Sequence, residues 1–184
     1  MKDDFEIIHK IKCGNTQLYS QLVEKYSERL FYVILNITRD YHNSEDLTQE
    51  TFIKAFNSLS NFEGKSKFYT YLYRIGVNLS INFLNSQTRE KNKLSFHDEI
   101  EINDSIFCSP LDMLEYKQTK EEINTIIEKL SPKLRAVVTL VLFDDLEISE
   151  AAEILQINAA TVTWRLFYAR KQIKLELEEL NKKQ

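Results

Sequence analysis

The sequence predicts an all-α protein with two small helical domains joined by a flexible acidic linker, the second domain containing a helix-turn-helix. Apolar residues recur three or four positions apart in both halves of the chain, which is the period of an amphipathic helix. Only 3 of the 184 residues are Gly and 2 are Pro, which argues against all-β and collagen-like classes. An acidic stretch over residues 92–114 interrupts the helical pattern.

The first domain is expected over residues 1–91. Its first helix is predicted by a stripe of apolar residues: Leu18, Leu22, Tyr26, Leu30, Val33, Ile34 and Ile37. Ser44 is expected to cap the next helix, because its hydroxyl can accept a hydrogen bond from a free backbone N–H there. A loop around Gly64 and a further helix from Tyr69 to about Ser86 complete this domain.

Residues 92–114 are expected to form the linker. They include Pro110 and show no helical stripe, and six acidic residues with no basic one lie between positions 94 and 115. A solvated surface loop within one domain is the alternative. The linker is favoured because structureless loops longer than about 15 residues are uncommon inside compact domains.

The second domain is expected over residues 115–184. Its first helix is predicted by the apolar residues Ile123, Ile126, Ile127 and Leu130. Ser131 and Pro132 then predict the start of a helix over 133–143, because Ser is a favoured cap and Pro fits the first helical turn.

A helix-turn-helix is predicted in the last part of the chain. Ser149 is expected to cap a short helix that ends at Leu155, and residues 156–158 are expected to form the turn. Asn158 would cap the long last helix. A short helix, a tight turn and a longer helix in this order are typical of DNA-binding domains.

Composition argues against several classes of protein. No stretch reaches the roughly 18 consecutive apolar residues of a membrane span, so no lipid insertion is expected, and the acidic N-terminal residues do not read as a signal peptide. Cys13 and Cys108 lack metal-like spacing, which favours free thiols in the cytoplasm. His9, His42 and His97 lie in no nucleophile or metal arrangement, so we expect no enzyme, metal or cofactor.

The net charge of −4 opposes nucleic-acid binding at first sight, but the charges are unevenly distributed. Basic residues gather in two stretches, over 65–93 and over 165–174. The first stretch contains one acidic residue, Glu90, and the second contains none. Through such local basic patches, a protein that is acidic overall can still contact the phosphates of a nucleic acid.

The helix that follows Ser44 carries an unusual polar face. Its residues Asp46, Gln49, Glu50, Lys54 and Asn57 surround Ile53 on a helical wheel. An exposed branched apolar side chain ringed by acids and an amide indicates a protein-docking patch. An ordinary solvated helix face is the alternative.

The stretch 56–85 is rich in aromatic residues, bases and amides. Aromatic faces can replace the stacking that bases lose when a duplex opens, while Lys and Arg hold phosphates. The alternative is that the aromatic residues belong to the core, and this is preferred for Phe56, Phe62, Leu72 and Ile75.

The last helix has a predicted buried stripe and a predicted outer face. The buried stripe comprises Val162, Leu166, Ala169, Ile173 and Leu180. The outer face comprises Thr163, Trp164, Phe167, Tyr168, Lys171 and Lys174. If this helix lay in a major groove of DNA, its basic side chains would contact phosphates. The residues near its N-terminal end would contact the edges of the nucleobases.

These motifs, in this order and spacing, resemble bacterial extracytoplasmic-function sigma factors of the sigma-E type. The resemblance rests on the segment from Asp46 to Phe52, on the stretch from Phe62 to Asn82, and on the matches at 130–135, 149–155 and 161–170. It implies a chain that binds core RNA polymerase and directs promoter-specific transcription initiation. The genes so transcribed would form a stress or envelope regulon.

The resemblance also implies roles for particular residues. Docking on the clamp of the largest polymerase subunit is assigned to Asp46, Gln49, Glu50 and Ile53. Recognition of the −10 promoter element is assigned to Gly64, Lys65, Ser66, Lys67, Phe68, Tyr71, Arg74, Asn78 and Asn82. Recognition of the −35 element is assigned to Asn158, Thr161, Thr163, Trp164, Arg165, Phe167, Tyr168, Arg170 and Lys171.

The chain departs from the family pattern at several of these positions. Tyr71 stands where Trp is common, and Thr163, Trp164 and Tyr168 replace a basic residue, a Ser and an Arg on the reading face. Two alternatives therefore stay open at this point. One is a stand-alone helix-turn-helix regulator that binds DNA without polymerase, and the other is a sigma-like protein that acts mainly through protein contacts.

The resemblance implies three kinds of partner. These are core RNA polymerase, through the clamp of its largest subunit and the flap of the second, promoter DNA, and an anti-sigma factor that is often anchored in the membrane. The family's anti-sigma factors wedge between the two domains, and a linker at 92–114 would permit such a switch.

Overall fold

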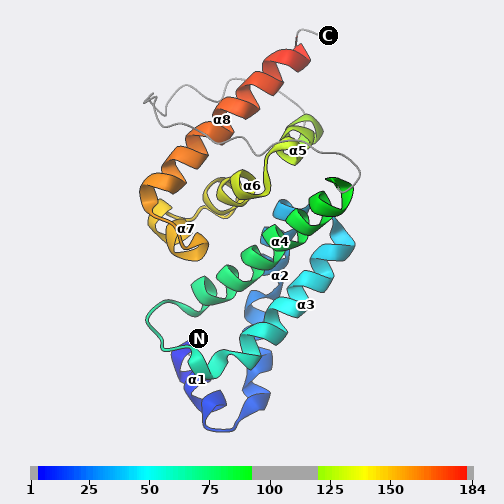
Figure 1. Ribbon diagram of the computed structural model, residues 1–184. Helices are drawn as coiled ribbons and strands as arrows, with labels where there is room; N and C mark the ends of the chain where they lie inside the picture. The colour runs from blue at the N-terminus through cyan, green and yellow to red at the C-terminus, as the bar shows by residue number, and fades with distance from the viewer. Residues whose placement is uncertain (1–3, 93–119, 182–184) are drawn as a thin grey trace.

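The computed structural model describes residues 4–92 and 120–181, and every regular element within these ranges is helical. The first group comprises α1 (Asp4–Lys12), η1 (Thr16–Leu18), α2 (Tyr19–Thr38), α3 (Tyr41–Asn57), η2 (Leu59–Asn61) and α4 (Phe68–Asn92). The second group comprises α5 (Lys120–Lys129), α6 (Pro132–Val138), η3 (Thr139–Phe143), α7 (Ile148–Leu155) and α8 (Ala159–Asn181). The prediction of an all-α protein with two helical domains is confirmed (Figure 1). Residues 93–114 of the predicted linker and Cys108 lie outside the described residues, as do the side chains of Ile123 and Leu180.

The first domain is built around α2, α3 and α4, which pack side by side (Figure 1). The predicted stripe of α2 is buried at Leu22, Leu30, Val33, Ile34 and Ile37, while Leu18 and Tyr26 are half-buried at its edge. Gly76 lets α4 approach the other two helices closely, since a Cβ there would lie 3.0 Å from Leu30 Cδ1 and 3.2 Å from Thr51 Oγ1. Burial of this apolar surface is the main stabilising contribution to the domain.

Helix α3 begins one turn before the predicted position. Arg39 ends α2 in the left-handed conformation, with φ of 61°, and Asp40 caps α3 by accepting a 2.9 Å hydrogen bond from the N–H of Asn43. Ser44 is therefore an internal residue, and its buried hydroxyl lies 2.7 Å from Thr38 Oγ1. The capping prediction for Ser44 was wrong, because Asp40 is an equally good cap and comes first.

An N-terminal helix, α1, was not predicted from the sequence. Its buried residues Ile7, Ile8 and Ile11 lie on one face and join the core of the first domain. Asp4 ties the helix to α2 by accepting a hydrogen bond from Tyr26 and forming a 2.5 Å ion pair with Lys25. The helical spacing of the three isoleucines was the signal that could have revealed α1.

The second domain confirms the helix-turn-helix but changes the start of one helix, α7. The predicted helix over 133–143 is α6, which passes at Val138 into the π-helical segment η3. Helix α7 starts at Ile148 with Glu147 at its N-cap position, so Ser149 lies inside the helix and does not cap it. Asn158 caps α8 as predicted, accepting a 2.6 Å hydrogen bond from the N–H of Thr161.

The two domains pack against each other along a surface that we call the seam. It places α6, η3 and α7 against α2 and α4 (Figure 1), and one continuous cluster of buried apolar residues runs across it. A smaller cluster lies wholly within the second domain and comprises Ile127, Leu130, Leu134, Val138 and Ala169. Shared apolar burial therefore holds the domains together in this structure.

Candidate functional site

The face of α3 formed by Asp46, Gln49, Glu50 and Ile53, here called the docking face, is exposed to solvent throughout. The opposite side of the helix is buried through Leu47, Thr51, Phe52 and Ala55, which fixes the orientation of the docking face. Ile53 is 60% exposed, an uncommon position for a branched apolar side chain that has no partner to cover it. Glu50 forms a 2.8 Å ion pair with Lys54, but both side chains are about half exposed, so the pair stabilises the fold little.

A shallow apolar groove of about 670 Å³ borders Ile53, between α3 and the start of α2. It is lined by Thr16, Gln17, Tyr19, Ser20, Val23, Glu24, Phe52, Ile53 and Phe56. Phe56 is 37% exposed at its wall, so the preference for a core position was wrong for this residue. Tyr19 is held in place because its hydroxyl donates a 2.7 Å hydrogen bond to the carbonyl of Phe52, and its burial raises the pKa of the phenol. Sequence patterning missed this groove, because its walls come from different helices.

The residues assigned to the −10 element divide into a buried and an accessible group. Phe68 is 1% exposed and Tyr71 is 8% exposed, and both pack against Phe62 in the core. As the chain is folded here, neither ring is free to stack on a base, which corrects the role assigned to them. Their positions support the loop that precedes α4 instead, since the Tyr71 hydroxyl lies 2.6 Å from Ser58 Oγ and donates to the carbonyl of Ala55.

The accessible group lies along the loop and one face of α4. Lys65, Lys67, Asn78 and Asn82 are exposed, while Gly64, Ser66 and Arg74 are half-buried. Gly64 has a φ of +76°, which favours glycine, and a Cβ there would lie 3.1 Å from a ring carbon of Phe5. Exposed basic and amide side chains of this kind are suited to contacts with phosphates and with the edges of nucleobases. Tyr69, which the sequence analysis did not assign, is half-buried beside Lys67.

Helix α1 holds the same loop from its other side. Phe5 stacks on Phe62 with ring centroids 6.3 Å apart and planes 19° apart. Lys12 donates hydrogen bonds to the carbonyls of Ser60 and Phe62, at 3.1 and 2.6 Å. These contacts order a loop whose backbone would otherwise be solvated, and they fix where its basic residues stand.

The residues assigned to the −35 element gather at the start of α8, but only part of the set is free. Thr163 and Lys171 are exposed, whereas the side-chain oxygen of Asn158 is engaged by both the N–H and the hydroxyl of Thr161. Arg165, Phe167 and Arg170 are half-buried, and burial lowers the pKa of the Arg165 guanidinium.

Trp164 and Tyr168 form a stacked pair on α8, with centroids 5.5 Å apart and planes 8° apart. Both are half-buried, and Tyr168 packs against the small cluster of the second domain. Trp164, Phe167 and Tyr168, which were predicted on the outer face, are therefore only partly exposed. Their aromatic surface is divided between the domain's own packing and solvent.

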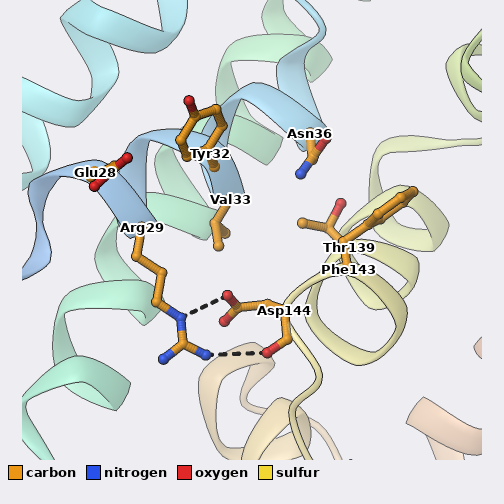
Figure 2. Close-up of a pocket in the computed structure, with 8 residues that line it drawn as sticks. All are labelled: Glu28, Arg29, Tyr32, Val33, Asn36, Thr139, Phe143 and Asp144. Carbon is orange, nitrogen blue, oxygen red and sulfur yellow. Dashed lines mark hydrogen bonds and ion pairs between the residues drawn. The ribbon is translucent and has the colours of Figure 1, made fainter.

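Polar contacts between described residues cross the seam. Arg29 on α2 donates to Asp144 Oδ1 at 2.8 Å and to the Asp144 carbonyl at 3.1 Å, beside a cavity of about 260 Å³ (Figure 2). Buried Arg135 donates a 2.8 Å hydrogen bond to the carbonyl of Ile37. Glu150 on α7 accepts from Tyr69 and forms a 3.2 Å ion pair with Lys67. No sequence pattern pointed to these contacts.

No helix in the described part of the chain is long and apolar enough to cross a membrane. No group of three or more His, Cys, Asp or Glu side chains in residues 4–92 and 120–181 could hold a metal ion.

Comparison with known proteins matches both domains to related family models. The model of Sigma-70 region 2 matches residues 22–90, and that of Sigma-70, region 4, matches residues 120–173. The chain is 29% identical to the RNA polymerase sigma-H factor of Pseudomonas aeruginosa, covering 97% of this chain and 96% of that protein. It is also 29% identical to the ECF RNA polymerase sigma-E factor of Escherichia coli K12, covering 96% and 95%.

A solved structure has the same fold. CnrH, in complex with the cytosolic domain of CnrY, superimposes with a TM-score of 0.68 at 20% identity. The superposition covers 94% of this chain and 96% of that one. It therefore spans both helical domains.

Proposed function

Because this chain belongs to the extracytoplasmic-function family of RNA polymerase sigma factors, we propose that its docking face binds the clamp of core RNA polymerase. As a sigma factor, the chain directs the polymerase to promoters and initiates transcription there. The observation that carries the docking proposal is the exposure of Asp46, Gln49, Glu50 and Ile53 on one side of α3. An apolar centre with a polar rim is the composition of an interface hot spot.

Promoter reading would be divided between the domains. In the first, Lys65, Lys67 and Arg74 would contact phosphates and Asn78 and Asn82 would contact bases of the −10 element. In the second, the start of α8 would enter the major groove at the −35 element. The exposed Thr163 offers a methyl group for thymine, and Lys171 offers a charge for the backbone.

Domain limits, location and regulation complete the proposal. The first domain would span residues 1–91 and the second 115–184, with the acidic segment between them as the linker. The chain would act in the cytoplasm on a stress or envelope regulon, and an anti-sigma factor, possibly membrane-anchored, would hold it inactive. The structure of the sigma factor RpoE from Bartonella quintana in complex with the anti-sigma factor NepR, which this chain resembles with a TM-score of 0.61 at 21% identity, supports a partner of this kind.

The test is co-elution of the full chain with core RNA polymerase on size exclusion, using Glu50→Lys and Glu6→Lys as a matched pair. Both residues are exposed and each pairs with a Lys four positions away, but Glu6 lies on α1, outside the docking face. We expect Glu50→Lys to abolish co-elution while Glu6→Lys retains it, with both variants keeping wild-type helical circular dichroism. Co-elution of folded Glu50→Lys would remove the assignment of the docking face.

A further inference from the structure

Several polar atoms at the start of α8 are occupied by the helix itself. Asn158 Oδ1 accepts hydrogen bonds from both the N–H and the hydroxyl of Thr161, at 2.6 and 2.7 Å, so both of its lone pairs are used. Thr163 donates its hydroxyl hydrogen to the carbonyl of Ala159 at 3.0 Å. Asn158 therefore cannot make the paired contact with adenine, which needs its oxygen as well as its nitrogen. Neither threonine has a hydroxyl hydrogen left to donate to a base.

Basic side chains are scarce at this end of α8. The first two turns contain one, Arg165, which lies between Trp164 and the buried Leu166 around the helix. It is half-buried, and its burial lowers the pKa of the guanidinium. Lys171 is exposed, but it stands about 16 Å further along the helix axis than Ala160, which suits a backbone phosphate. The first two turns of α8 therefore offer no exposed Arg or Lys for the bidentate contact that most often specifies guanine.

The outer side of this end of α8 is apolar. Ala160, Trp164 and Phe167 lie on one side of the helix, opposite its buried stripe, and Thr163 lies beside them. Ala160 and Thr163 are exposed, whereas the rings of Trp164 and Phe167 are half-buried. Because the Thr163 hydroxyl is turned to the backbone, its methyl group is the part left to contact a ligand. A base edge that approached this side of the helix would therefore meet methyl groups and aromatic rings.

The ring of Trp164 is held in one orientation. It stacks on Tyr168 with centroids 5.5 Å apart and planes 8° apart, and Tyr168 itself packs against the small cluster of the second domain. An aromatic side chain that is fixed before binding loses little conformational entropy when a ligand arrives. Of the four bases, thymine alone carries a methyl group on its major-groove edge, so it is the base that an apolar surface can select.

We propose that α8 reads its promoter element mainly through the C5-methyl groups of thymine, and that Trp164 is the residue that determines this specificity. Tyr168 is a positioning residue, which acts through the stacked ring. The inference rests on the proposed function, because it takes α8 as the helix that enters the major groove. Lys171 would contact the phosphate backbone further along the helix and add affinity that does not depend on sequence.

The test uses the full chain assembled with core RNA polymerase. The complex first selects its sites from duplexes that carry a random segment, and the upstream of the two enriched blocks is the element assigned to α8. Each thymine in this block is then replaced by deoxyuracil, which keeps the hydrogen-bonding groups of thymine and lacks only its methyl group. We expect binding to weaken about fourfold at one or more of these positions, as for the loss of one buried methyl group. The same replacement between the two blocks is the control and should leave binding unchanged.

Variants of the stacked pair identify the residues responsible. Trp164→Ala should bind the thymine and deoxyuracil duplexes equally, whereas Trp164→Phe should still discriminate between them. Leu175→Ala, at an exposed apolar position further along α8, is the matched control and should discriminate like the wild type. Tyr168→Leu keeps an apolar side chain against the cluster but removes the stacked ring, so it should lose discrimination, and Tyr168→Phe should retain it. The ratio of the two affinities separates positioning from a general loss of stability.

Three outcomes would overturn the inference alone. They are an upstream block without thymine, equal binding of the two duplexes by the wild type, and full discrimination by Trp164→Ala. The first two would leave the aromatic pair as a surface for a protein partner. A chain that forms no complex with core polymerase would instead refute the proposed function, and this inference with it.

Discussion

Asp144 accepts a 2.8 Å hydrogen bond from Nε of Arg29, although 115 positions separate the two residues in the chain. The Asp144 side chain is only 10% exposed, whereas that of Arg29 is 56% exposed. Burial raises the pKa of the Asp144 carboxyl, and the guanidinium of Arg29 opposes that shift. The seam thus contains a desolvated acid whose charge is compensated by one neighbouring base from the other domain.

The two members of this pair should differ in their effect on stability. Removing Arg29 leaves the buried carboxylate without its cation, so Arg29→Ala should lower the free energy of unfolding by about 1–3 kcal/mol. Asp144→Asn leaves only an exposed cation and should cost less. Urea unfolding of both variants at neutral pH measures the difference. A larger loss in Asp144→Asn would contradict this account of the seam.

The contributions of Glu150 and Asp144 to folding stability should change with pH in opposite directions. Hydrogen bonding to Tyr69 lowers the pKa of Glu150 below its ordinary value, so its contribution to stability is present above the unfolded-state pKa and is lost as pH falls through the folded-state pKa. The raised pKa of Asp144 makes its contribution largest at low pH, with loss as pH rises through the folded-state value. Glu150→Gln should therefore be less stable than wild type at pH 7, and the difference should vanish on acidification. A constant difference across that range would rule out this linkage.

The close helix contacts at Gly76 predict that even the methyl side chain of Ala would lower the stability of the fold there. Gly76→Ala gains about 1 kcal/mol of helix propensity, but its methyl group would lie 3.0 Å from Leu30 Cδ1 and must displace packed neighbours. We expect a net loss of about 1–2 kcal/mol in thermal or urea unfolding. Asn82→Ala, at an exposed position of the same helix, is the control and should not destabilise the chain. A stabilised Gly76→Ala would show that the three helices relax freely.

Helix α1 should control the order of the loop before α4. Lys12→Ala removes the donor to the carbonyls of Ser60 and Phe62, and we expect backbone amides over 60–65 to exchange with solvent faster. Lys10→Ala is the matched control, because Lys10 pairs with Glu6 one turn away on the exposed side of α1. Hydrogen exchange followed by mass spectrometry makes the comparison. Equal exchange in the two variants would mean that α1 does not hold the loop.

The apolar centre of the docking face should carry much of the affinity for polymerase. Ile53→Ala removes a side chain that is 60% exposed, so the fold should lose little stability. Binding to core polymerase should weaken by about tenfold, as expected for a hot-spot residue. Leu175→Ala on α8, which is 51% exposed, controls for loss of an exposed apolar side chain elsewhere. Equal affinities of the two variants in a titration would place the hot spot outside Ile53.

Local pattern was enough to predict most helices and the exposure of the docking face. The period of apolar residues decides which side of α3 faces inward, so Ile53 could be recognised as exposed before any packing was known. The cap at Asn158 and the turn before α8 also depend only on neighbouring residues. Helix starts were less certain, because Asp40 and Ser44 are both good caps and the end of the preceding helix selects between them.

Only the tertiary structure decided which aromatic residues are core and how the domains meet. Phe68 and Tyr71 lie in a stretch where nearly every position is bulky, so periodicity could not separate core from surface until α1 and the loop were placed around them. The contacts of Arg29 with Asp144 and of Lys67 with Glu150 join residues 115 and 83 positions apart, and no local pattern marks them. A sequence determines the faces that its helices present, whereas the pairing of those faces depends on which burial, hydrogen bonds and charges can be satisfied together in the whole fold.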